Sequence, residues 1–177
     1  MSQIVRADAL VREAKKTLGW KYQWGKAEAG LVDCSGLIVY LLHGLGGRVP
    51  FHGTNTMYRT DCVGNHLSLN QAKPGYLCFK VRKWTEKEQA NRNYGKEPGD
   101  VYHVGIMSDN GKIINAASPK LGVIESDPNT WDSCARLKGV DYDSLLDSKT
   151  AFDYLLDELS AVIEKYRGRL TNGKTDS

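Results

Sequence analysis

The sequence predicts an α+β domain in which N-terminal helices pack on a small antiparallel sheet, with an extra helix near the C-terminus. Three observations predict this class: apolar residues recur with a helical period early in the chain, short apolar segments separated by turn residues follow, and the helical period returns after residue 150. Helices first, then a run of strands, then a closing helix is the α+β order.

The chain has the composition of a folded domain. It contains 177 residues, of which 41% are hydrophobic and 25% are charged, which excludes a disordered chain, a collagen and a coiled coil. The net charge of +3 is too small to indicate a nucleic-acid groove, although it suits a protein that acts near an anionic polymer. The longest apolar run, residues 37–42, is far shorter than the ~20 residues that span a bilayer. We therefore expect neither nucleic-acid binding nor membrane insertion.

Two helices are predicted in the first 45 residues. Residues 3–18 form an amphipathic pattern that Gly19 ends, and residues 20–32 form a glycine-broken loop. A second helix follows Asp33 as its N-cap and ends at Gly44. The apolar positions of the two helices are spaced by three or four: Ile4, Ala7, Val11, Ala14 and Leu18, then Cys34, Leu37, Ile38, Leu41, Leu42 and Leu45.

The middle of the chain predicts strands. Residues 48–73 have no period and are expected to be irregular, and residues 83–99 form a polar, exposed loop. Strands are predicted over 76–82, 101–107, 112–117, 123–126 and 134–138. Apolar residues at helical spacing return over 150–168, and a polar tail follows. We accordingly expect the main domain over residues 1–145, and over residues 146–177 a helix packed on it with a frayed tail.

Cys34 is the candidate nucleophile. The segment Asp33-Cys34-Ser35-Gly36 places this cysteine in the first turn of a helix. There the macrodipole and the unpaired N–H groups are expected to lower the pKa of the thiol. A lone cysteine at such a position is more often a small packing residue, so a partner is needed to favour catalysis.

His103 is the candidate partner. In a strand over residues 101–107, Tyr102, Val104 and Ile106 share one apolar face. His103 therefore lies on the other face, next to Gly105, which allows another element to approach. On its own this histidine would be read as a structural one.

Asn115 can orient that histidine if the hairpin has the right register. A three-residue loop over residues 109–111 pairs Ser108 with Lys112, which makes His103 and Asn115 diagonal neighbours on one face. The amide can then accept a hydrogen bond from one imidazole nitrogen and leave the other directed to the cysteine. This is the orienting role of the third residue in a Cys-His-Asn arrangement.

The remaining histidines and cysteines are not assigned to catalysis. His43 lies half a turn around the helix from Cys34, and His52 and His66 are expected at the surface or lining the substrate site. No two of the four cysteines form a CxxC pair, and Cys62 with His66 is weak evidence for a metal. Cys78 and Cys134 are interpreted as packing residues, and neither a metal nor a cofactor is expected.

Three sequence blocks resemble the NlpC family of papain-like bacterial cell-wall cysteine peptidases, over roughly residues 4–138. The blocks are Tyr22-Gln23-Trp24-Gly25, Asp33-Cys34-Ser35-Gly36-Leu37, and His103-Val104-Gly105-Ile106 followed by Asn115 twelve residues on. The resemblance implies a papain-like fold and hydrolysis of peptidoglycan stem peptides, typically between D-γ-glutamate and the following diamino acid. It also implies a catalytic set of Cys34, His103 and Asn115.

The resemblance further implies a binding role for the residues around the cysteine. Tyr22 would lie near the nucleophile and help to bind substrate or stabilise the oxyanion, and Asp33 would position that end of the site. Ser35 and Trp24 belong to the same motifs and are assigned to the same group.

The chain departs from the family pattern at several places. Lys26 stands where a second glycine is usual, Tyr76 replaces an acidic residue, the 83–99 loop is longer, and the helix over 150–168 is additional. These changes affect the groove and the periphery more than the catalytic set. The reaction type is therefore predicted more firmly than the bond cleaved.

Two alternatives belong to other functional classes. One is an acyltransferase of similar fold that uses the same thiol. The other is a catalytically silent wall-binding or phage-tail component, which would not need the joint presence of Cys34, His103 and Asn115.

The start of the chain carries no signal-peptide pattern. The sequence therefore predicts synthesis in the cytoplasm and delivery to the bacterial wall by a holin, a phage or a secretion system, with a phage or prophage lysin as the first choice. The expected partner is the peptidoglycan stem peptide. A monomer is expected, with a dimer through the C-terminal helix as the alternative.

Overall fold

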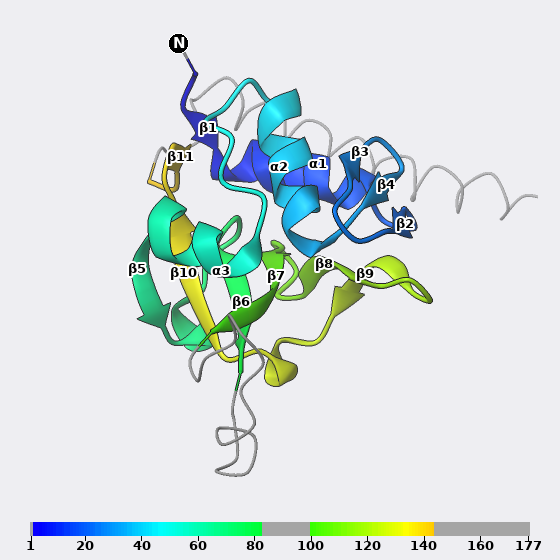
Figure 1. Ribbon diagram of the computed structural model, residues 1–177. Helices are drawn as coiled ribbons and strands as arrows, with labels where there is room; N and C mark the ends of the chain where they lie inside the picture. The colour runs from blue at the N-terminus through cyan, green and yellow to red at the C-terminus, as the bar shows by residue number, and fades with distance from the viewer. Residues whose placement is uncertain (1, 83–99, 144–177) are drawn as a thin grey trace, which may run out of the picture. The chain divides into compact units, whose positions relative to one another are not determined.

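The computed structural model describes residues 2–82 and 100–143 (Figure 1). The predicted loop over 83–99 and the predicted helix over 150–168 lie outside the described residues, as does the polar tail. In the described part of the chain, no helix is long and apolar enough to cross a membrane.

Two helices and three short strands form the N-terminal part. The helices are α1 (Ala7–Lys16) and α2 (Cys34–Gly44). The strands β2 (Lys21–Tyr22), β3 (Ala27–Glu28) and β4 (Leu31–Val32) form a small sheet in the order β2-β4-β3. The loop predicted over 20–32 therefore contains three short strands.

Strands from the middle of the chain form a six-stranded antiparallel sheet, in the order β5-β10-β6-β7-β8-β9. Its strands are β5 (Cys62–Leu67), β6 (Leu77–Val81), β7 (Val101–Met107), β8 (Ile113–Ser118), β9 (Gly122–Ser126) and β10 (Ser133–Leu137). The predicted α+β class is confirmed, with helices α1 and α2 lying over the sheet (Figure 1).

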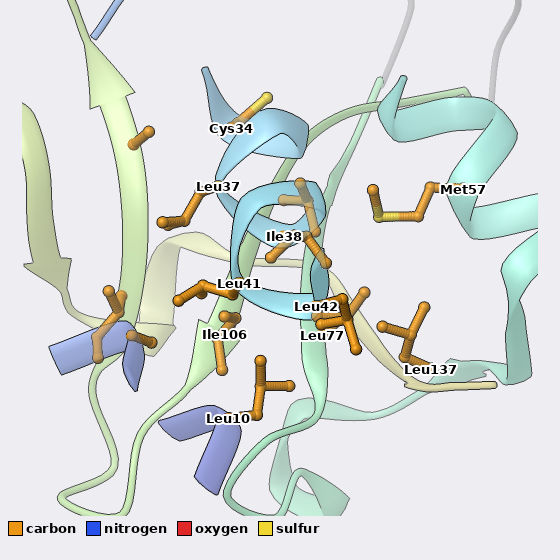
Figure 2. Close-up of a cluster of buried hydrophobic side chains, with 14 of the residues drawn as sticks. Leu10, Cys34, Leu37, Ile38, Leu41, Leu42, Met57, Leu77, Ile106 and Leu137 are labelled. Atoms are coloured by element: carbon orange, nitrogen blue, oxygen red, sulfur yellow. The ribbon is translucent and has the colours of Figure 1, made fainter. Parts of the chain in front are cut away.

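Helix α2 is the central element of the core. It contacts α1, the small sheet and strands β7 and β8, and its side chains Leu37, Ile38 and Leu42 are fully buried. Burial of each of these side chains stabilises the fold by about 1.5–3 kcal/mol. Figure 2 shows Cys34 at the start of α2, beyond this stack of apolar side chains. The core therefore fixes the position of the thiol.

The first predicted helix is too long at both ends. Its ends Ile4 and Leu18 were expected in the buried stripe, but they are 74% and 42% exposed. The reason at the N-terminal end is that β1 (Val5–Arg6) pairs in parallel with β11 (Val140–Asp141). Strand pairing here replaces the first helical turn.

The segment predicted as irregular is more ordered than expected. It contains α3 (Thr54–Thr56), a π-helical turn η1 (Met57–Asp61), strand β5 and the 3₁₀ turn η2 (Leu69–Gln71). Strand β5 pairs with β10 across about seventy residues of sequence, a partner that local patterning does not reveal.

Tyr102 is a further correction. It was expected on the apolar face of β7 but is 51% exposed. Lys80 pairs with His103 whereas Val81 pairs with Val101, so Tyr102 is the extra residue of a β-bulge. The bulge turns its side chain outward and buries Val101 instead.

Candidate active site

The predicted N-cap holds the cysteine in place. The Asp33 carboxylate accepts hydrogen bonds from the Gly36 amide at 2.6 Å, the Ser35 hydroxyl at 3.1 Å and the Gly25 amide at 2.7 Å. Asp33 therefore caps α2 and ties the loop that carries Trp24 to the first turn of the helix. A Cβ at position 36 would overlap the carbonyl oxygen of Lys26, which explains the glycine in this motif.

A histidine that was not assigned to the catalytic set also contacts Asp33. His52 Nε2 lies 3.1 Å from each carboxylate oxygen of Asp33. Two residues farther on, Thr54 Oγ1 lies 3.4 Å from Cys34 Sγ. The segment after α2 thus folds back onto the start of this helix, where His52 contacts Asp33 and Thr54 contacts the thiol.

The thiol of Cys34 is buried, and this changes its acidity. Burial raises the pKa of Cys34, and the Asp33 carboxylate adds to the rise, whereas the Thr54 hydroxyl and the amides of Val104 and Ser35 oppose it. The expectation of a lowered pKa is therefore wrong, because desolvation of a thiolate outweighs the helix terminus. The amides that oppose it are groups that stabilise a thiolate once it forms.

His103 and Asn115 meet as the hairpin register predicts. Strands β7 and β8 pair Ile106 with Ile114, and the amide of Ser108 donates to Lys112 O at 2.8 Å. This is the three-residue loop with its glycine in the left-handed region. His103 Nε2 then lies 2.9 Å from Asn115 Oδ1.

The surroundings of Asn115 fix the tautomer of the imidazole. Asn115 is buried, and its Nδ2 donates to Ile113 O at 3.1 Å and to Ser126 Oγ at 2.7 Å. Its Oδ1 is therefore the atom that faces His103, so Nε2 carries the proton and Nδ1 of the neutral ring can accept one. Burial lowers the pKa of His103, as does Lys80, while the Asn115 hydrogen bond opposes this. The net lowering of the pKa favours the neutral form of the ring.

The structure brings the thiol to the strand that carries His103. The backbone amide of Val104, the residue that follows His103, opposes the rise in the pKa of the Cys34 thiol. Among the described residues, however, the side-chain hydrogen bond of Sγ is the one with Thr54 Oγ1, and none joins it to His103. The pair His103–Asn115 is therefore formed, and Cys34 is linked to strand β7 through Val104.

The other predicted binding residues surround Cys34. Trp24, Asp33, Ser35 and Cys34 line a cleft of about 400 Å³. Tyr22 lies close enough to Cys34 and Asp33 that their charges, together with the larger effect of burial, raise the pKa of its phenol.

Further residues line the cleft. Thr54 and the bulge residue Tyr102 were not assigned to the site, and His52 lines the cleft as well, whereas His103 does not. Thr54 was missed because it lies in the segment without a period, and Ser126 because its contact with Asn115 depends on the pairing of β8 with β9. His52 was expected to be a surface or substrate-lining residue, but its pairing with Asp33 was not foreseen.

The remaining cysteines are packed in the interior. Burial raises the pKa of Cys62 to about 12 and that of Cys134 to about 11, and it also raises that of Cys78. Cys78 and Cys134 are fully buried, which confirms their interpretation as packing residues. Among residues 2–82 and 100–143, no group of three His, Cys, Asp or Glu side chains could hold a metal ion.

A cysteine at the start of a central helix, packed on an antiparallel sheet that carries a His–Asn pair, defines the papain-like class of fold. Residues 19–138 match the NlpC/P60 family. The chain belongs to this family.

Individual relatives agree with this assignment. The chain is 34% identical over 108 residues to "Probable endopeptidase p60" of Listeria innocua and 31% identical over 125 residues to "Protein P54" of Enterococcus faecium. These matches cover 61% and 68% of this chain but only 19% and 21% of the two relatives. The chain thus spans about a fifth of the curated relatives it matches.

A solved structure shows the same fold. The NlpC/p60 domain of the peptidoglycan hydrolase SagA has a TM-score of 0.59 and 27% sequence identity, and the match covers 75% of this chain and 100% of that domain.

Proposed function

We propose that the chain is a cysteine endopeptidase that hydrolyses peptidoglycan stem peptides. Cys34 is the nucleophile, His103 the general base and Asn115 the residue that orients the imidazole. The observation that carries this proposal is the His103 Nε2–Asn115 Oδ1 hydrogen bond of 2.9 Å, because it leaves Nδ1 as the proton acceptor. The names of the relatives, an endopeptidase and a peptidoglycan hydrolase, support the substrate class.

The reaction follows from the groups around the thiol. His103 Nδ1 takes the proton of Cys34 Sγ, and the thiolate attacks the carbonyl carbon of the scissile amide. The backbone N–H of Cys34, at the start of α2, stabilises the oxyanion, together with Tyr22. The imidazolium then protonates the leaving amine, and water hydrolyses the thioester with His103 again as the base.

The bond cleaved is proposed from the resemblance to the family. It is the amide between D-γ-glutamate and the following diamino acid. Digestion of purified peptidoglycan from several bacterial types, with mass spectrometry of the fragments, tests both the bond and the diamino acid. New amino termini on the diamino acid are expected.

The control for this digestion is a pair of cysteine variants. Cys34→Ala is expected to release no fragments, while Cys62→Ala, which changes a buried cysteine outside the cleft, keeps the activity. Fragments released by Cys34→Ala, or none released by the unmodified chain from any peptidoglycan, would overturn the proposal.

We also propose that the enzyme acts as a phage or prophage lysin-like hydrolase. Expression in a bacterial cytoplasm with and without a co-expressed holin tests this route. Lysis that requires the holin is expected, and lysis without it would contradict the route while leaving the peptidase assignment intact.

A further inference from the structure

The side chain of Trp131, shortly before strand β10, lies against the imidazole ring of His103. The ring centroids of His103 and Trp131 are 5.3 Å apart at an interplanar angle of 33°. The ammonium of Lys80 lies 5.1 Å from the centroid of the same indole. Lys80 is also the direct cross-strand partner of His103 in the β6–β7 pair, so the two side chains share a face of the sheet.

The backbone holds Trp131 rigidly at this place. Its amide donates to Pro128 O at 2.9 Å, and the next amide, of Asp132, donates to Phe79 O at 3.0 Å. The Asp132 carboxylate also accepts from the Val81 amide at 2.9 Å. Trp131 is 6% exposed, so the indole has little freedom to leave the imidazole.

Packing alone does not explain a tryptophan here. Its Nε1 is buried and has no hydrogen-bond partner in the described part of the chain, and such a group destabilises a fold by about 1–3 kcal/mol. A phenylalanine would fill apolar space without that cost. The indole offers instead the side-chain ring face that attracts cations most strongly. The Lys80 ammonium and the His103 imidazole both lie near it.

We propose that Trp131 is a positioning residue for His103, an inference that rests on the proposed peptidase function. The hydrogen bond to Asn115 fixes one atom of the imidazole but leaves the ring able to turn about that bond. Contact with the indole restricts this rotation and keeps Nδ1 directed to the thiol. When Nδ1 takes the proton of Cys34 Sγ, the new imidazolium lies near the indole ring and is stabilised there.

Two variants of Trp131 separate a positioning role from a packing role. Trp131→Phe keeps an aromatic ring, and Trp131→Leu keeps only apolar volume. We expect Trp131→Leu to lower kcat about tenfold or more with little change in KM, and Trp131→Phe to lower it less, because a phenyl ring still restricts the imidazole but attracts the imidazolium more weakly. Trp20→Leu is the matched control, because Trp20 makes its edge-to-face contact with Tyr40, at a centroid distance of 5.0 Å, and it should keep kcat.

A second measurement does not depend on hydrolysis. The NMR signals of the His103 ring protons should carry a ring-current shift that Trp131→Leu abolishes and Trp20→Leu leaves in place. Unchanged His103 signals in folded Trp131→Leu would overturn the ring contact. Changed signals with unaltered kcat would overturn the positioning role. If the unmodified chain shows no hydrolysis, the peptidase function fails, while the NMR signals still test the ring contact.

Discussion

The imidazole side and the thiol side of the site are held in different ways. His103 and Asn115 lie on adjacent strands joined by a three-residue loop, and their contact follows from the register of one hairpin. Cys34 is held by segments far apart in sequence, because Asp33 connects the Gly25 loop and His52, and Thr54 contacts the thiol. The position of the imidazole is thus set locally, by one hairpin. The position of the thiol depends on tertiary contacts between distant segments.

The difference also concerns charge. Both reactive groups are desolvated, which raises the pKa of Cys34 and lowers that of His103. Burial therefore favours a neutral thiol beside a neutral imidazole. The ion pair must form during the reaction, with Thr54 and nearby amides stabilising the thiolate.

The largest expected effect comes from removing the thiol of Cys34. Cys34→Ala should abolish hydrolysis, since no other group in the cleft replaces the nucleophile. The lost sulfur is one buried heavy atom, so the free energy of unfolding should fall by only about 1 kcal/mol. Peptide hydrolysis and urea denaturation measure the two quantities. Residual hydrolysis near the unmodified rate would show that the nucleophile lies elsewhere.

Labelling should distinguish Cys34 from the other cysteines. Cys34 lines the cleft and has polar groups that oppose the rise of its pKa, whereas burial raises the pKa of Cys62 to about 12 and that of Cys134 to about 11. Limited alkylation with iodoacetamide, followed by peptide mapping, should modify Cys34 first. Equal labelling of all four cysteines would contradict the nucleophile assignment.

The sequence predicted the contact between His103 and Asn115 better than the tertiary contacts around Cys34. Turn length and alternation gave the contact between His103 and Asn115, and the N-cap pattern gave the start of α2 at Cys34. Neither pattern could place His52 or Thr54, because their contacts depend on how an aperiodic segment folds back over the helix.

The acidity of the thiol shows a further limit of sequence reasoning. The helix terminus is visible in the sequence, but the burial of Cys34 is a property of the whole fold. Its desolvation therefore reversed the expected direction of the pKa. The bulge at Tyr102 could not be predicted for a similar reason, since it depends on the pairing of β6 with β7.

Removal of the orienting amide tests the local side. Asn115→Ala should lower kcat by less than His103→Ala does, since general acid–base catalysis itself contributes about 10²–10⁴-fold. Asn115→His should retain more activity than Asn115→Ala, because an imidazole nitrogen can also accept the hydrogen bond from Nε2. Steady-state kinetics of the three variants provide the test. Full activity in Asn115→Ala would mean that another group orients His103.

Removal of the N-cap tests the tertiary side. Asp33→Ala should lower the free energy of unfolding by about 1–2 kcal/mol, because three donors and His52 lose their acceptor. Asp127→Ala is the matched control, since Asp127 caps a short exposed turn through one amide at 2.9 Å. Urea denaturation should show a clearly smaller loss for the control. Equal losses would show that Asp33 does not hold the segments together.

The smallest expected effect concerns the charge beside His103. Burial lowers the pKa of His103, and the charge of Lys80 lowers it further, while the hydrogen bond to Asn115 opposes both. Lys80→Met removes the cation and keeps the length of the side chain, so the pKa of His103 should rise. Catalysis requires the neutral imidazole, which then forms only at higher pH. The acid limb of the kcat/KM profile should therefore move to higher pH, while Lys16→Met, which changes a lysine paired with Glu13 on α1, leaves it in place. A limb that stays fixed in Lys80→Met, or moves to lower pH, would show that this limb does not report the protonation of His103.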